Sequence, residues 1–96
     1  MSEQWPFDQG PNVAAITTRQ VLESGLPVLR VTHYFDDDSW GFVCGTTNKT
    51  EDLRVIAMEE ALKSDPTLKT IANLPPGWTA WREKVGDPWH KKQSKK

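Results

Sequence analysis

The clearest alternation of hydrophobic and polar residues lies between positions 27 and 44. Two runs rich in β-branched and aromatic residues, 27–35 and 40–44, flank the turn-forming residues Asp36, Asp37 and Asp38. A two-residue turn between Asp36 and Ser39 fixes the facing pairs, which are Val31 with Cys44, His33 with Phe42, and Phe35 with Trp40. One face of this hairpin then carries Leu29, Val31, His33, Phe35, Trp40, Phe42 and Cys44. Because side chains alternate between the two faces of a strand, this face is predicted to form the core.

Shorter patterns predict further elements on both sides of the hairpin. Residues 12–16 and 53–57 are apolar runs that favour strands. Thr17 as N-cap, with Gln20 three residues later, predicts a capping box and a short helix that ends near Gly25. The chain therefore alternates between strands and short helices.

The second half of the chain predicts two more helices and one ambiguous segment. One helix starts at Met58, with acidic residues in its first turn. Asp65 and Pro66 read as the N-cap and first residue of the next helix, whose apolar side carries Leu68, Ile71 and Leu74. Residues 78–84 alternate without a clean apolar face, which is typical of an edge strand or an extended surface segment.

These elements define an α+β fold. Residues 12–89 are predicted to form a single α+β domain, an antiparallel sheet of about four strands around the central hairpin, covered by two or three short helices. Residues 1–11 are an irregular arm whose Trp5 and Phe7 are expected to lie against the body. Residues 90–96 are expected to be a disordered basic tail. A chain of 96 residues has room for one core.

The charge distribution bears on the class of partner. The net charge is −1, but four of the twelve basic residues lie in the last six positions. Residues 1–90 hold 8 basic and 13 acidic residues, a net charge of −5. An acidic body argues against a nucleic acid as partner, because such sites usually present a basic face. A basic protein is the better complement.

The chain shows no sign of export or of membrane insertion. Its longest apolar run is four residues, whereas a spanning helix needs about twenty. The N-terminus lacks the basic and apolar regions of a signal peptide, and the lone Cys44 cannot form an internal disulfide. The sequence therefore predicts a cytoplasmic protein without a membrane partner.

Several short motifs together resemble a known family. They are Trp40-Gly41-Phe42-Val43-Cys44-Gly45, then Pro75-Pro76-Gly77-Trp78-Thr79-Ala80-Trp81-Arg82, and Asp87-Pro88-Trp89. Over roughly residues 7–89 the chain resembles a family of small bacterial domains of unknown function, grouped with the predicted immunity proteins of polymorphic toxin systems. The resemblance implies a cytoplasmic α+β domain that binds and neutralises a protein partner, a toxin, and it implies no catalytic residues.

Cys44 and His33 are the candidates for catalysis. In the expected register they lie diagonally on one face of the hairpin, where a thiolate and an imidazole could pair as in a small hydrolase or thiol enzyme. The competing interpretation treats Cys44 as a small core hydrophobe and has His33 bonded to a backbone carbonyl.

The acidic triplet at the hairpin tip is a candidate binding element. Asp36, Asp38 and Gly41 have the spacing that opens a calcium loop, but Thr47 stands at the twelfth position, where that loop needs an acid. No metal or other cofactor is therefore expected. Asp36, Asp37 and Asp38 instead suit a solvated turn or the presentation of negative charge to a basic partner.

The tryptophans form the second candidate element. Trp78, Trp81 and Trp89, together with Arg82, are residue types that anchor protein interfaces. The alternative is that the indoles pack over the sheet edge as large burial units. The favoured interpretation is a non-catalytic protein-binding domain that uses the acidic tip and these C-terminal residues.

Overall fold

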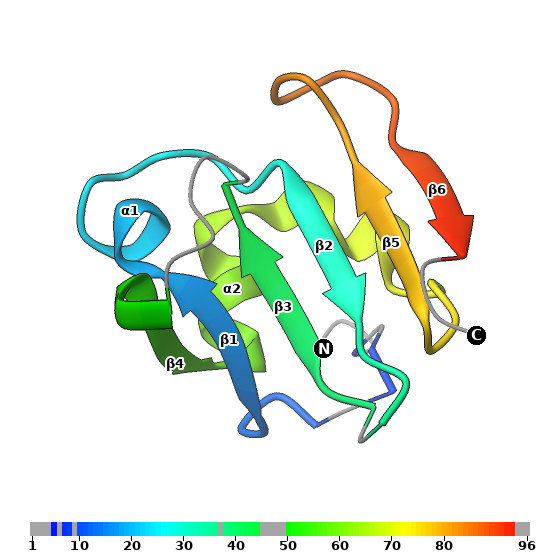
Figure 1. Cartoon of the computed structure of the whole chain (residues 1–96), viewed down its shortest axis with the longest axis horizontal. Coiled ribbons are helices and arrows are strands. Elements are labelled where there is room, and N and C mark those ends of the chain that lie inside the picture. Colours follow the sequence, from blue (N-terminus) through cyan, green and yellow to red (C-terminus); the bar gives the residue numbers. More distant parts are fainter. Residues whose placement is uncertain (1–4, 6, 9, 37, 45–49, 94–96) are drawn as a thin grey trace.

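The fold is built on one mixed sheet of six strands in the order β4-β1-β3-β2-β5-β6 (Figure 1). The computed structural model describes residues 5, 7–8, 10–36, 38–44 and 50–93. The strands are β1 (Ala14–Thr18), β2 (Arg30–His33), β3 (Trp40–Val43), β4 (Leu53–Ala57), β5 (Trp78–Trp81) and β6 (His90–Gln93). The helices are α1 (Arg19–Leu22), α2 (Met58–Ser64) and the 3₁₀ helices η1 (Thr50–Asp52) and η2 (Pro66–Ile71).

The α+β class is confirmed, but the sheet differs from the expected antiparallel sheet of about four strands. β1 and β3 run parallel, with Ile16 beside Gly41, and every other neighbouring pair is antiparallel. After β1 the chain passes through α1 and forms β2 two positions away from β1 in the sheet. The hairpin then brings β3 back into the position between β1 and β2. This crossover depends on tertiary packing, so no local pattern predicts it.

The hairpin register is shifted by two residues from the expected one. His33 pairs with Trp40 and Val31 with Phe42, and the Tyr34 amide donates to the Ser39 carbonyl at 2.8 Å. The connecting loop is therefore longer than two residues, with Asp38 in the left-handed region at φ 60°. An even shift keeps the paired side chains of β2 and β3 on their expected faces, because side chains alternate with a period of two.

Two members of the expected core face, Phe35 and Leu29, lie outside the paired strands and are not fully buried. Phe35 lies beyond the last pair of the sheet and is 57% exposed. Leu29 is half-buried, and its neighbour Val28 is buried instead. β2 begins at Arg30, so Val28 and Leu29 lie outside the strand and do not follow its alternation.

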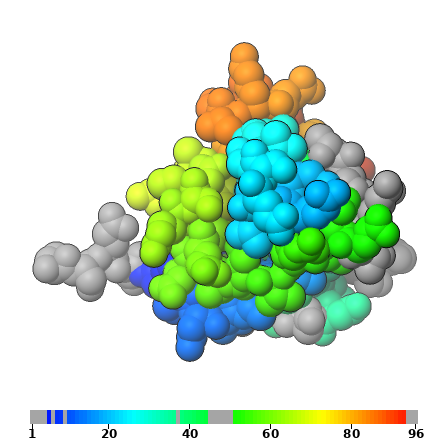
Figure 2. Space-filling model, turned by 90° about the vertical axis from the view of Figure 1, so that its left-hand side faces the viewer, coloured from blue at the N-terminus to red at the C-terminus, as the bar shows by residue number. Residues whose placement is uncertain are grey.

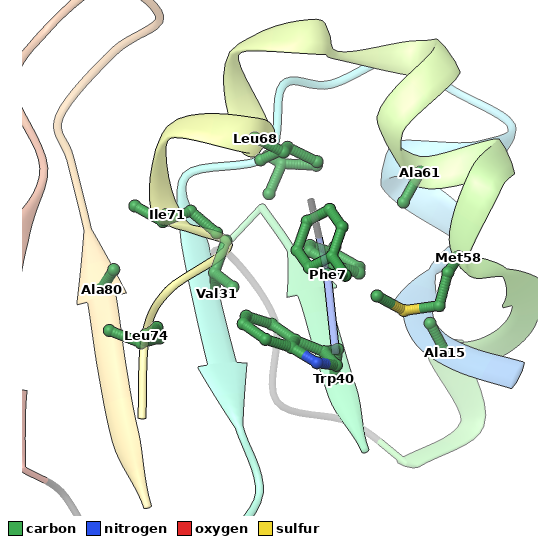
Figure 3. Close-up of a cluster of buried hydrophobic side chains, with 12 residues drawn as sticks. Phe7, Ala15, Val31, Trp40, Met58, Ala61, Leu68, Ile71, Leu74 and Ala80 are labelled. Carbon is green, nitrogen blue, oxygen red and sulfur yellow. The ribbon is translucent and has the colours of Figure 1, made fainter. Parts of the chain in front are cut away.

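The core lies between the sheet and the helices α2 and η2 (Figure 3). It contains Phe7, Ala15, Val28, Val31, Trp40, Phe42, Met58, Ala61, Leu68, Ile71, Leu74 and Ala80. The aromatic ring of Phe7 meets Trp40 edge to face, with 5.0 Å between ring centroids. Trp5 packs against the same cluster, so these two aromatics of the N-terminal arm lie on the body as expected.

The helix starts follow local side-chain bonds. The Asp65 carboxylate accepts a bond from the Thr67 amide at 3.0 Å, and Pro66 is the first residue of η2, as predicted. The capping box at Thr17 is wrong, because Thr17 belongs to β1 and its hydroxyl donates to the Phe42 carbonyl at 2.6 Å. Thr18 is the N-cap instead, and helix α1 begins one residue later than predicted, at Arg19.

The C-terminal region is more ordered than the charge pattern predicted. β5 is an interior strand between β2 and β6, and β6 contains residues of the expected disordered tail. All four side chains of β6 are exposed, so this strand is held mainly by backbone pairing with β5 and has no apolar signature. Residues 94–96 lie outside the described residues.

One face of the sheet has no helix over it among the described residues. In Figure 1 this face is toward the viewer, and α2 passes behind the sheet. Pairing places Ile16, Arg30, Thr32, Gly41, Val43, Leu53, Val55, Thr79, Trp81, His90 and Lys92 on this face, called here the open face. None of the helices in the described part of the chain is long and apolar enough to cross a membrane.

Candidate functional site

The hairpin tip presents charge and aromatic surface together. Asp36 and Asp38 are exposed, and Asp37 lies outside the described residues. Phe35 is exposed beside them, and Tyr34 lies over Gly41 on the open face, where an added Cβ would meet the Tyr34 ring at 3.1 Å. The sequence therefore located an accessible acidic tip, although not the aromatic residues next to it.

The three C-terminal tryptophans do not form one cluster. Trp78 pairs with His33, and both Trp78 and Trp89 pack against the core. Trp81 lies on the open face, where its ring stacks on His90 with centroids 5.5 Å apart. The alternation of β5 sends Trp78 and Trp81 to opposite faces, and this separation could have been seen from their odd spacing alone.

Arg82 is buried and takes part in a structural network. Its guanidinium donates to Asp65 at 2.7 Å, to the Thr67 hydroxyl at 3.1 Å and to the Val28 carbonyl at 3.0 Å. The guanidinium carbon also lies 4.3 Å from the centre of the Trp89 ring. These contacts join the end of β5 to the start of η2. Only 4% of Arg82 is exposed, so little of its surface is accessible to a protein partner.

Cys44 and His33 lie toward opposite ends of the hairpin. His33 pairs with Trp40, and Cys44 lies four positions after Trp40, which corresponds to about 13 Å of extended chain. Cys44 is buried, and its sulfur is 3.9 Å from the Thr18 hydroxyl. The structure therefore does not bring the thiol and the imidazole together.

His33 instead has the surroundings of a core residue. Its ring stacks on Trp40 at 4.0 Å between centroids. Its Nδ1 is 2.7 Å from the Leu74 carbonyl, which can only accept, so Nδ1 carries the hydrogen. This bond is the one that the core interpretation predicted.

An ion pair near the start of α1 was not foreseen. The Arg19 guanidinium donates to the buried Asp52 carboxylate at 2.7 Å, and Gln20 donates to the other oxygen at 3.1 Å. The hydrogen bond and the charge of Asp52 raise the pKa of Arg19 above its ordinary value. The pair joins α1 to η1 and has a structural role.

The open face is the feature that sequence reasoning missed. Its β1–β4 part exposes large apolar side chains, since Val55 is 72% exposed and Leu53 is 43% exposed. Residues 53–57 contain apolar side chains on both faces, so alternation could not show that one face of this strand meets solvent. β4 is also an edge strand of the sheet.

Two hollows lie on opposite sides of the sheet. One, of about 430 Å³, lies on the helix side between α1 and α2 and is lined mainly by apolar residues, including Val21, Leu22 and Ile56. Figure 2 views the molecule from the left-hand side of Figure 1, where the chain around α1 and the following loop (blue to cyan) lies against α2 (yellow-green). The other, of about 350 Å³, lies on the open face and is lined by Arg30, Thr79, Trp81 and Lys92.

Within the described residues, no group of three or more His, Cys, Asp and Glu side chains is placed to hold a metal ion.

Comparisons with protein-family models, with curated proteins and with solved structures give no match to this chain.

Proposed function

We propose that this chain is a non-catalytic protein-binding domain that docks its partner on the β1–β4 part of the open face. The observation that supports this most is the exposure of Val55 and Leu53 beside Ile16, with no helix over them in the described structure. A patch of exposed apolar side chains is typical of protein interaction sites. A toxin is the partner class that the family resemblance implies.

The edge of the sheet adds a second means of docking. Among the residues that the structure describes, β4 pairs only with β1, so its other side presents backbone groups to a partner strand. A strand added there would supply main-chain hydrogen bonds, while Val55 and Leu53 would supply apolar contact. The acidic tip with Asp36 and Asp38 stays a candidate for steering a basic partner.

The thiol-enzyme alternative has less support. A catalytic thiolate must be accessible to substrate and must lie near a base. Cys44 is buried, and about 13 Å of extended chain separates it from Trp40, the residue that pairs with His33. The exposed surfaces of the domain favour binding over nucleophilic chemistry.

The test is a binding measurement with a matched pair of valine variants. The purified chain is titrated with toxins encoded next to its gene, and Val55→Asp is compared with Val85→Asp, a similarly exposed valine outside the sheet. A charge at the centre of the interface is expected to weaken binding at least about tenfold in Val55→Asp only. Equal affinities of the two variants would overturn the docking surface, and binding to none of these toxins would overturn the toxin assignment.

A further inference from the structure

The open face has a second, chemically different region over β2, β5 and β6. The register places Arg30, Trp81 and His90 in one row across the three strands. The next row holds Thr32, Thr79 and Lys92. Arg30 and Lys92 thus occupy opposite corners of the hollow, with Trp81 and Thr79 between them, and long side chains at these corners can reach one object held at the centre.

The two cations of this hollow are not neutralised by the described part of the protein. Each of the other three arginines has a carboxylate partner, namely Arg19 with Asp52, Arg54 with Glu23, and Arg82 with Asp65. Within the same residues, Arg30 and Lys92 have no ion pair, and no strand residue of the open face is acidic. Two uncompensated cations around a concave surface favour an anionic ligand.

The indole of Trp81 adds a flat apolar wall beside these charges. It lines the hollow and is already stacked on His90, which orients the ring within the row. Anions that carry a flat ring can use both features, because aromatic side chains stack on bases and Arg and Lys bind phosphate oxygens. A volume of about 350 Å³ lies at the lower end of the range for small-ligand sites, about 300–1,000 Å³.

We propose that this hollow binds a free mononucleotide, with the phosphate between Arg30 and Lys92 and the base against Trp81. A longer single strand fits less well, because it needs cations at successive phosphates and would meet a body of net charge −5 over residues 1–90. The site is separate from the β1–β4 docking surface and does not depend on the proposed function.

The test follows ¹H–¹⁵N NMR signals of the full chain during titration with adenosine monophosphate. Saturable shifts are expected at the Trp81 indole and at the amides of Arg30, Thr79 and Lys92. Arg30→Gln and Lys92→Gln should each weaken binding about tenfold. Lys69→Gln, which changes an exposed lysine of η2 away from this face, should leave the affinity unchanged.

Partial ligands separate the two halves of the proposal. Adenosine and inorganic phosphate should each bind more weakly than adenosine monophosphate, and Trp81→Ala should weaken the nucleotide more than the phosphate. The NMR spectrum of each variant also shows whether it is folded. The proposal is overturned if the shifts do not saturate in the millimolar range, if they fall on other residues, or if Lys69→Gln weakens binding equally. Tighter binding of an eight-nucleotide adenosine strand would overturn the assignment to a free nucleotide.

Discussion

Arg82 combines a buried charge with several fixed partners. Its side chain is almost fully buried, and its carboxylate partner Asp65 is buried to a large extent as well. Such a pair is sensitive to loss of one member, because the remaining charge stays in a poorly solvated place. Arg54 and Glu23 form a contrasting pair at 3.5 Å, with both side chains partly exposed to solvent.

Replacing each arginine by methionine measures this difference. Arg82→Met is expected to lower the free energy of unfolding by about 3 kcal/mol, since it leaves Asp65 unpaired. Arg54→Met should lower it by less than about 1 kcal/mol. Urea denaturation of the two variants and the parent gives the values. Equal losses in the two variants would contradict the structural role assigned to Arg82.

The thiol of Cys44 provides a second test at the scale of one residue. Because Cys44 is buried, an aromatic disulfide reagent should label it slowly in the native protein and rapidly in denaturant. Cys44→Ala should lose some stability through the space left in the core. Native labelling as fast as that of the unfolded chain would contradict the burial and revive the catalytic interpretation.

Some residue roles follow from the sequence alone, and others depend on contacts between distant positions. The His33 bond to a carbonyl and the Asp65 cap were predicted, because each follows from the residue type and its neighbours. The role of Arg82 was not, since its acceptor Val28 is 54 positions away in the chain. Arg82 shares its residue type with interface anchors, and only burial distinguishes the two roles.

At the scale of elements, the hairpin is defined by its register. The structure pairs Val31 with Phe42 and leaves Phe35 outside the sheet, whereas the sequence-based register put Phe35 opposite Trp40. Phe42 is buried in both registers, so the two registers differ mainly in whether Phe35, at the tip of the hairpin, is buried.

Two phenylalanine truncations separate the registers. Phe42→Ala is expected to cost about 3–5 kcal/mol of stability, enough to unfold much of a domain of this size. Phe35→Ala should cost less than about 1 kcal/mol, because the side chain is already mostly in solvent. Thermal melts followed by circular dichroism compare the two. A large loss in Phe35→Ala would support the register expected from the sequence.

Strand β6 gives the second prediction at this scale. A chain that ends at Trp89 lacks β6 and exposes the edge of β5, so it should lose about 1–3 kcal/mol of stability through the missing backbone hydrogen bonds. Denaturation midpoints of the full and shortened chains measure the change. An unchanged midpoint would mean that residues 90–93 behave as the disordered tail that their charge predicted.

Local signals account for which elements were found from the sequence. β4, α2 and η2 were predicted because apolar runs, acidic first turns and an Asp-Pro cap act within a few residues. β6 consists of exposed polar residues, and the parallel pairing of β1 with β3 joins strands far apart in the chain. Such features depend on backbone pairing and topology, which composition does not record.

At the scale of the whole molecule, the sheet has two unlike faces. The helix side buries the core, and the open face divides into an apolar part at Leu53 and Val55 and a cationic part at Arg30 and Lys92. Net charge conceals this division, because none of the acidic residues in the described part of the chain lies on a strand. The sequence could identify an acidic body, but only the strand order shows where the cations gather.

Both proposed binding sites lie on the open face, so both require that solvent reaches this face. The direct measurement is paramagnetic relaxation of methyl signals by a soluble gadolinium chelate, which acts on groups that solvent reaches. The methyl groups of Val55 should relax strongly, and those of Val31, on the helix side, should be almost unaffected. Equal protection of Val55 and Val31 in the monomer would show that the face proposed for binding is covered.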